Sequence, residues 1–202
     1  MAAQGKRNPA WEEVPPEPVP IGGLRDLRDR IETGHHRAEV IDGELVVSPM
    51  PVIWHEKVCQ WLVRSLDEVC EAHDWFLDTA GEIDLPPTGD LVEPDLMILR
   101  DAGTLPDFES LRPLDRVLLA GEVISASSIR RDREVKPRAC ALAGIPLYLL
   151  VDRFTKPVTI SLHSEPGPNG YAKVKTVIAG EKLRLPAPFG RTLDTSSLPL
   201  PG

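Results

Sequence analysis

Glu122 is an acidic residue within an apolar segment, residues 117–124, which has the sequence VLLAGEVI. The length and composition of this segment predict a buried β-strand. Because an ionised carboxylate without a partner is costly inside a protein, Glu122 needs a cation, a metal ion or strong hydrogen bonds. Strand alternation places Glu122 on one face with Leu118, Ala120 and Ile124, and the other residues on the opposite face. Glu122 is therefore a candidate site residue.

A second carboxylate, Asp95, precedes another strand-like segment, residues 96–99 with the sequence LMIL. It follows Pro94, which suits the first position of a strand, where the missing N–H costs least. An aspartate at this place often only caps a turn. If the two segments are neighbouring strands, Asp95 and Glu122 supply hard oxygen ligands, which favour Mg²⁺ or Mn²⁺ over Zn²⁺. The histidines are scattered, and we expect none of them to form a metal-binding pair with a cysteine.

A cluster of basic side chains begins eight residues after Glu122, and it consists of Arg130, Arg131, Arg133, Lys136 and Arg138. Such a cluster can bind phosphate groups, or it can be a solvated helix face paired internally with Asp132 and Glu134. The spacing alone favours the second interpretation. The net charge of -8 argues against a protein that coats nucleic acid, but it permits an enzyme with one basic patch.

The apolar periodicity predicts the elements that would position these groups. Helical spacing predicts helices at 24–31, at 52–73 and in a segment that ends at Gly144. The Asp-Gly dipeptide at 42–43 predicts a type I′ hairpin over residues 38–47. Further strands are predicted at 75–79, 81–85, 94–99, 117–124, 147–151, 157–163, 171–177 and 181–185.

The segment 117–124, the helix after it and the strand 147–151 predict a parallel strand–helix–strand crossover. We expect hairpins before and after this unit to extend the sheet with antiparallel strands. The predicted fold is a single α/β domain with a mixed central sheet, a long N-terminal amphipathic helix on one face and a crossover helix. Residues 1–20 are predicted to be a flexible proline-rich tail, 21–185 the domain, and 186–202 a C-terminal tail on the surface.

The composition is that of a globular chain: 202 residues, 42% hydrophobic and 27% charged. Cys59, Cys70 and Cys140 have no CxxC spacing, so they are expected to be reduced core thiols. The N-terminus has no apolar signal-like segment, and no segment approaches the roughly 18 apolar residues of a membrane span. We therefore expect a cytoplasmic protein without a membrane partner.

Several motifs occur in the order and spacing of one known family. They are Asp-Gly-Glu44, His55, Pro-Asp95, Gly-Glu122, Lys136, and the segment from Gly144 to Asp152. Together they resemble the Uma-type family of putative restriction endonucleases, which belongs to the PD-(D/E)XK nuclease superfamily. The resemblance spans residues 38–185 and implies a restriction-endonuclease-like core.

The resemblance also implies an activity, which is the metal-dependent hydrolysis of phosphodiester bonds in DNA. Asp95, Glu122 and the backbone carbonyl of Val123 match the positions that hold Mg²⁺ or Mn²⁺. The lysine that the superfamily usually has two residues after the glutamate is matched by Lys136 on the following helix. Glu44 matches a further acid of the catalytic site.

Two partners follow from this interpretation. The DNA substrate is expected to contact the basic cluster through Arg130, Arg131, Arg133 and Arg138. A homodimer is also expected, since restriction-type domains often pair to cut two strands. Pro137 departs from the family pattern: it follows Lys136 directly, which places the lysine at the start or the kink of a helix.

Two alternatives remain. The acidic balance and Pro137 suit a catalytically silent relative that acts as a binding or assembly module, in which Lys136 would point away from Glu122. An unrelated enzyme with two carboxylates, such as a glycoside hydrolase, ranks last, because aromatic residues make up only 5% of the chain and sugar-binding platforms need them.

Overall fold

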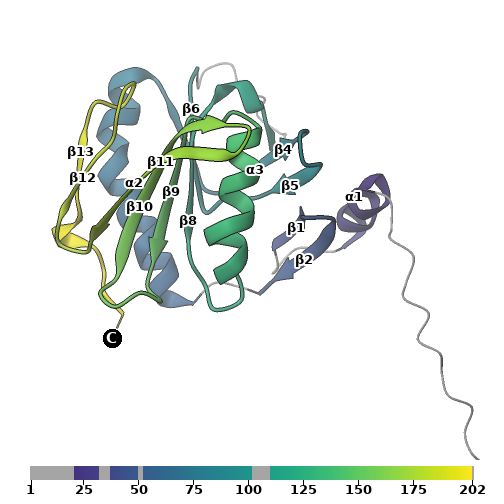
Figure 1. The fold of residues 1–202 in the computed structure, drawn as a ribbon, viewed down its shortest axis with the longest axis horizontal. Coiled ribbons are helices and arrows are strands. Elements are labelled where there is room, and N and C mark those ends of the chain that lie inside the picture. Colours follow the sequence, from purple (N-terminus) through teal and green to yellow (C-terminus); the bar gives the residue numbers. More distant parts are fainter. Residues whose placement is uncertain (1–20, 32–36, 50–51, 102–109, 202) are drawn as a thin grey trace, which may run out of the picture.

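The computed structural model describes residues 21–31, 37–49, 52–101 and 110–201 (Figure 1). The tail predicted over residues 1–20 lies outside the described residues. The three predicted helices are observed as α1 (Ile21–Arg30), α2 (Ile53–His73) and α3 (Lys136–Leu142). None of the helices described is long and apolar enough to cross a membrane.

A six-stranded mixed sheet forms the centre of the molecule, with the strand order β11-β10-β9-β8-β6-β3. Its strands are β3 (Phe76–Asp78), β6 (Leu96–Leu99), β8 (Val117–Val123), β9 (Leu147–Asp152), β10 (Thr159–Gly167) and β11 (Gly170–Ile178). β8 and β9 run parallel, with α3 in the connection between them, which confirms the predicted crossover. The β10–β11 hairpin extends the sheet with antiparallel strands, as predicted.

A second sheet of five strands has the order β2-β1-β5-β4-β7. Its strands are β1 (Arg37–Ile41), β2 (Glu44–Ser48), β4 (Glu82–Leu85), β5 (Asp90–Val92) and β7 (Leu111–Arg112). The predicted β1–β2 hairpin is observed, with positive φ angles of 53° at Asp42 and 74° at Gly43. The prediction that this hairpin extends the central sheet is wrong, because β1 pairs instead with β5, a strand too short to be recognised in the sequence.

Two hydrophobic cores lie on opposite faces of the central sheet. One face is covered by α2 and by a small sheet of β12 (Lys182–Arg184) and β13 (Thr192–Asp194), as Figure 1 shows. The opposite face is covered by α3 and the second sheet. The apolar stripe of α2 is buried at Val58, Leu62, Leu66 and Val69, which explains the amphipathic pattern of this helix.

Strand β8 lies between the two cores, and the alternation of its side chains decides which face of the sheet Glu122 lies on. Ala120 and Ile124 contribute to the core beneath α3, on the face predicted for Glu122. The prediction is wrong at the start of the strand, where Val117 joins this core and Leu118 joins the opposite one. The cause is an irregularity in the pairing of β6 with β8, where the register shifts and the alternation restarts.

The C-terminal segment does not form the surface tail predicted for residues 186–202. Phe189, Leu193 and Leu198 are buried in the core that α2 covers, with at most 5% of each residue exposed. Glycine and polar residues separate these three side chains, so the segment has no sustained helical or strand period that the sequence could reveal. The domain therefore extends beyond residue 185.

The helical connection after β8 accommodates Pro137 by a change of helix type. A π-helical turn, Arg131–Val135, precedes α3, so Lys136 lies at a helix start, as Pro137 predicts. In π-helical pairing the carbonyl of Asp132 would accept from the N–H five residues later, but proline has none. The phenolic O–H of Tyr148 donates to this carbonyl instead, at 3.0 Å.

Candidate functional site

A cavity of about 450 Å³ opens beside the carboxyl end of β8, where residues of both sheets, α2 and the crossover helix meet. The ionisable residues that line it include Arg37, Glu39, His55, Asp95, Glu122, Asp132 and Lys136. Apart from Arg37, each of these residues is at most 8% exposed. Water therefore screens the interactions among their charges only weakly.

Lys136 lies at the centre of three carboxylates. Its Nζ is 2.6 Å from Glu122 Oε1, 2.9 Å from Glu39 Oε1 and 3.9 Å from Asp132 Oδ1. The two shorter distances are those of charge-assisted hydrogen bonds. The predicted convergence of Glu122 and Lys136 is observed, which contradicts the orientation expected for a silent relative.

Asp132 is a buried acid that the sequence offered only as a partner of the basic cluster. Its Oδ2 accepts a hydrogen bond from Ser128 Oγ. Its Oδ1 has no hydrogen-bond partner among the described residues, although it is buried. Burial raises the pKa of Asp132 to about 6, and the charge of Lys136 and the hydrogen bond from Ser128 only partly oppose this shift.

Asp95 is held by three donors. Arg37 Nη1 lies 2.6 Å from Asp95 Oδ1, while His55 Nε2 and the backbone N–H of Val123 lie 2.9 Å and 2.8 Å from Oδ2. Burial disfavours the charged form of Asp95. The hydrogen bond from His55 and the charge of Arg37 outweigh this effect and hold the pKa of Asp95 below its usual range. Asp95 is thus an ionised carboxylate.

The pKa of Glu122 is shifted in the opposite direction to that of Asp95. Burial raises its pKa well above the usual range, and Asp95, Asp132 and Glu39 add to this effect against the opposing charge of Lys136. Burial disfavours the charged form of Lys136, but the carboxylates of Glu122, Glu39 and Asp132 outweigh it and raise the pKa of the ammonium group. The ammonium group stays protonated, and negative charge is in excess around Glu122.

The structure does not bring the fourth predicted catalytic residue, Glu44, to the cavity. Glu44 is exposed on β2, the edge strand of the second sheet, and is absent from the cavity lining. Glu39, on the neighbouring strand β1, is 3% exposed and contacts Lys136 instead. The acid of the hairpin that lines the cavity is thus Glu39 and not Glu44, the residue that the family motif indicates.

Glu39 and Arg37 are therefore the site residues that the sequence reasoning missed. Both alternate with the buried residues Ala38 and Val40 on β1, so they share one strand face. Strand alternation marks Glu39 in the same way as Glu122, since Glu39 is an acid within an otherwise buried strand.

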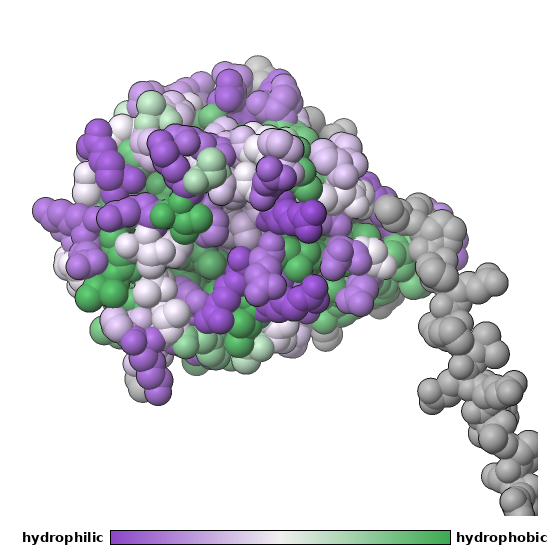
Figure 2. Space-filling view, viewed as in Figure 1, coloured by the Kyte–Doolittle hydropathy of each residue, from purple (hydrophilic) through white to green (hydrophobic). Residues whose placement is uncertain are grey.

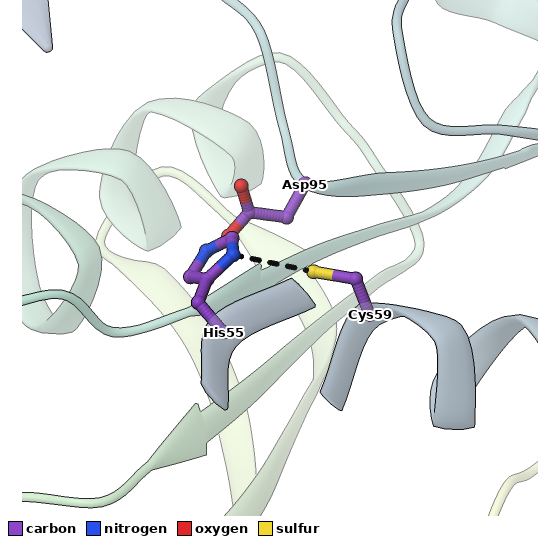
Figure 3. Close-up of side chains that lie close together, drawn as sticks. All are labelled: His55, Cys59 and Asp95. Carbon is purple, nitrogen blue, oxygen red and sulfur yellow. Dashed lines mark hydrogen bonds and ion pairs between the residues drawn. The ribbon is translucent and has the colours of Figure 1, made fainter. Parts of the chain in front are cut away.

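The expectation that no histidine pairs with a cysteine is also wrong. Cys59 Sγ lies 3.6 Å from His55 Nδ1, one turn along α2, as Figure 3 shows. His55 is buried and contacts Asp95 through its other ring nitrogen. Because the two residues are four apart in the sequence, helical spacing was a signal that could have revealed this pair.

The four arginine side chains that are predicted to contact DNA have different surroundings. Arg131 lines the cavity and donates to the carbonyl of Ser127 at 2.7 Å. Arg133 pairs with Asp152 at 2.7 Å, while Arg130 and Arg138 are exposed. Hydrophilic residues cover much of the face on which α3 lies, with small hydrophobic areas between them (Figure 2).

A mixed sheet with a parallel pair, a crossover helix and an Asp–Glu–Lys cluster at the end of the pair are the features of a restriction-endonuclease-like fold. The Uma2 family, described as "Putative restriction endonuclease", matches residues 24–196, and the chain belongs to this family. The resemblance inferred from the motifs is confirmed. The match also includes the C-terminal segment that packs into the core.

A solved structure has the same fold. It is that of a putative nuclease belonging to DUF820 from Anabaena variabilis, with a TM-score of 0.66 and 15% sequence identity. The similarity covers 87% of this chain and 96% of that one. At this identity the likeness establishes the fold alone. No curated protein matches the sequence.

Proposed function

We propose that this protein is a metal-dependent endonuclease that hydrolyses phosphodiester bonds in DNA. The observation that carries the proposal is the 2.6 Å contact between Lys136 Nζ and Glu122 Oε1, in a cavity that Asp95 also lines. Residues from three separate motifs of a nuclease family thus meet in one place.

Lys136 is the proposed catalytic cation. A preorganised ammonium group in a partly dry site stabilises negative charge that develops on a phosphoryl oxygen in the transition state. Glu122 and Glu39 hold the ammonium group from two sides, so its position does not depend on the substrate. We assign Glu39 as a positioning residue for Lys136, in place of Glu44.

Asp95, Glu122 and the backbone carbonyl of Val123 would hold Mg²⁺ or Mn²⁺. The donor set fits, because hard divalent ions prefer oxygen ligands. The charge fits as well: burial raises the pKa of Glu122, the neighbouring acids add to this shift, and a cation would relieve the repulsion among these carboxylates. A bound divalent ion polarises the phosphate and lowers the pKa of a water molecule.

The DNA backbone is proposed to contact Arg130, Arg131, Arg133 and Arg138. These side chains supply local positive charge in a chain whose net charge is -8. Binding through phosphate contacts should weaken steeply as salt increases. The homodimer expected from the sequence stays a prediction.

The proposal is tested by incubating the protein with supercoiled plasmid in the presence of Mg²⁺, Mn²⁺ or a chelator. The wild-type protein should nick or linearise the plasmid only when a divalent ion is present. Glu122→Gln and Lys136→Met should each lower the rate by about 100-fold or more, the typical effect of removing a preorganised electrostatic group.

Glu39 and Glu44 provide a matched pair of variants. Glu39→Gln should slow cleavage, because it removes one of the two carboxylates that position Lys136. Glu44→Gln should leave the rate unchanged, because Glu44 is exposed and does not line the cavity. Folded wild-type protein that cuts nothing with either ion would favour the silent binding module.

A further inference from the structure

A second cluster of metal-binding side chains lies on the α2 side of Asp95 (Figure 3). His55 and Cys59 project from adjacent turns of α2, and Asp95 approaches the imidazole from the start of β6. One ligand atom from each residue lies within 4.8 Å of the other two. We propose that His55, Cys59 and Asp95 form a binding site for a soft divalent cation of the Zn²⁺ class.

The spacing of the ligand atoms fits such an ion. Zinc bonds of about 2.0–2.3 Å in a tetrahedral site separate the ligand atoms by roughly 3.2–3.7 Å. His55 Nε2 lies 2.9 Å from Asp95 Oδ2, whereas Cys59 Sγ lies 3.6 Å from Nδ1, the other nitrogen of the same ring. One ligand atom of each residue lies within 4.8 Å of the other two, so binding an ion at Nε2 would require the Cys59 side chain to move closer to that nitrogen. Two ligands four residues apart on a helix are the spacing of known helical zinc sites.

The ligand types select against the hard ions of the nuclease reaction. Thiolate and imidazole ligands favour Zn²⁺ and similar ions, whereas Mg²⁺ prefers carboxylates and water. When the ion binds, the thiol proton of Cys59 passes to solvent, and the imidazole proton moves from Nε2 to Nδ1. The thiolate and the carboxylate would supply two negative charges to the ion, and Arg37, which pairs with the other oxygen of Asp95, would leave one positive charge beside it.

The cluster has its own access from solvent. A second cavity of about 440 Å³ is lined by His55, Cys59 and Asp95, with Glu56 and Thr79 among the other lining residues. His55 and Asp95 also line the first cavity, so they form part of the wall between the two. An ion can therefore reach Cys59 without passing the Lys136 cluster.

The consequence for catalysis rests on the proposed nuclease function. Asp95 is the one residue that both metal sites use. A soft ion on Asp95 Oδ2 withdraws this carboxylate from the Mg²⁺ site, so Zn²⁺ should inhibit cleavage. The soft-metal site itself exists independently of any nuclease activity.

The site is tested with Cd²⁺ as a spectroscopic substitute for Zn²⁺, in the absence of DNA. Titration of the folded protein should produce an ultraviolet thiolate-to-metal charge-transfer band that saturates at about one equivalent. Cys59→Ala and Cys59→Ser should abolish the band. Cys70→Ala is the matched control, since Cys70 is a buried free thiol on the same helix that lines neither cavity, and this variant should keep the band.

His55→Gln should weaken Cd²⁺ binding at least about tenfold while it leaves the thiol in place. A wild-type protein without the band overturns the proposal, and so does a band that persists in both Cys59 variants. Because this readout needs no cleavage, it separates failure of the soft-metal site from failure of the nuclease proposal. In an active protein, Zn²⁺ inhibition should be relieved by Cys59→Ala.

Discussion

At the scale of single residues, the site consists of three carboxylates arranged around the ammonium group of one lysine. Glu39, Glu122 and Asp132 surround the ammonium group of Lys136, and all four residues are at most 3% exposed. Removing one partner of a buried ion pair leaves an uncompensated charge, which costs more than the pair itself contributes. The same lysine that is proposed to assist catalysis is therefore required for the stability of the fold.

Lys136→Met should destabilise the protein by about 3–5 kcal/mol, the typical cost of leaving a buried charge unpaired. In a Glu122→Gln background the same substitution should cost less, because one of the abandoned carboxylates is gone. Urea unfolding of the two single variants and the double variant measures the coupling. Additivity within about 0.5 kcal/mol would show that the two side chains do not interact in solution.

Asp132 should make the stability depend on pH. Its pKa is raised from 3.8 to about 6 in the folded protein, so the folded state binds more protons than the unfolded state in this window. The free energy of unfolding should therefore fall as the pH rises from about 4 to 6, because the contribution of Asp132 is lost in this range. The loss is about 3 kcal/mol at most. The carboxylate is unfavourable at neutral pH.

Asp132→Asn, which keeps an acceptor for Ser128, should therefore be more stable than the wild type at pH 7.5. The difference should shrink towards zero near pH 4, where the carboxyl is protonated in both states. Urea unfolding of both proteins across this range measures it. A stability difference that does not change with pH would mean that Asp132 titrates normally in the folded protein.

At the scale of the elements, the crossover helix places Lys136, the proposed catalytic lysine, directly before a proline. The π-helical turn and the hydroxyl of Tyr148 make this possible, because the hydroxyl satisfies the carbonyl of Asp132 that Pro137 leaves without a partner. Lys136 therefore reaches β8 although Pro137 follows it. Tyr148, on strand β9, thus stabilises the helical connection that places Lys136 in the site.

Tyr148→Phe should destabilise the protein by about 1–3 kcal/mol, since it leaves a buried carbonyl unsatisfied. In a Pro137→Ala background the effect should be smaller, because alanine supplies an N–H to that carbonyl. A double-mutant cycle in urea tests this coupling. An equal cost of Tyr148→Phe in both backgrounds would indicate that the hydroxyl acts elsewhere.

At the scale of the whole molecule, the C-terminal segment completes the core that α2 covers. The indole N–H of Trp54 donates to the carbonyl of Pro199 at 3.1 Å, and that of Trp61 donates to Ser197 Oγ at 3.0 Å. These contacts join the end of the chain to the helix that supplies His55. The segment therefore supports the candidate site from a distance.

A chain that ends at residue 185 should not fold stably. It lacks Phe189, Leu193 and Leu198, and losing a single large buried side chain typically costs roughly 2–5 kcal/mol, against about 5–15 kcal/mol for a whole domain. Circular dichroism and thermal unfolding measure the loss. A chain that ends at residue 199 is the control and should unfold like the full chain, because it removes only the exposed Leu200 and the residues after it.

The sequence by itself determined the parts of the site that depend on local patterns. Apolar runs and period-two alternation predicted β8, β9 and the helix between them, and with these the positions of Glu122 and Lys136. The family motifs added Asp95. These predictions succeeded because a strand or a helix records its own period in the residues that it contains.

Only the tertiary structure decided which acid of the hairpin faces Lys136, where the C-terminal segment packs, and that α2 presents a thiol and an imidazole to Asp95. Each of these depends on the pairing of segments that are far apart along the chain. Glu39 and Glu44 lie on β1 and β2, the paired strands of one hairpin. Their surroundings differ because β1 also pairs with β5, whereas β2 lies at the edge of the sheet. Such pairings are set by the packing of the complete fold, and no local period encodes them.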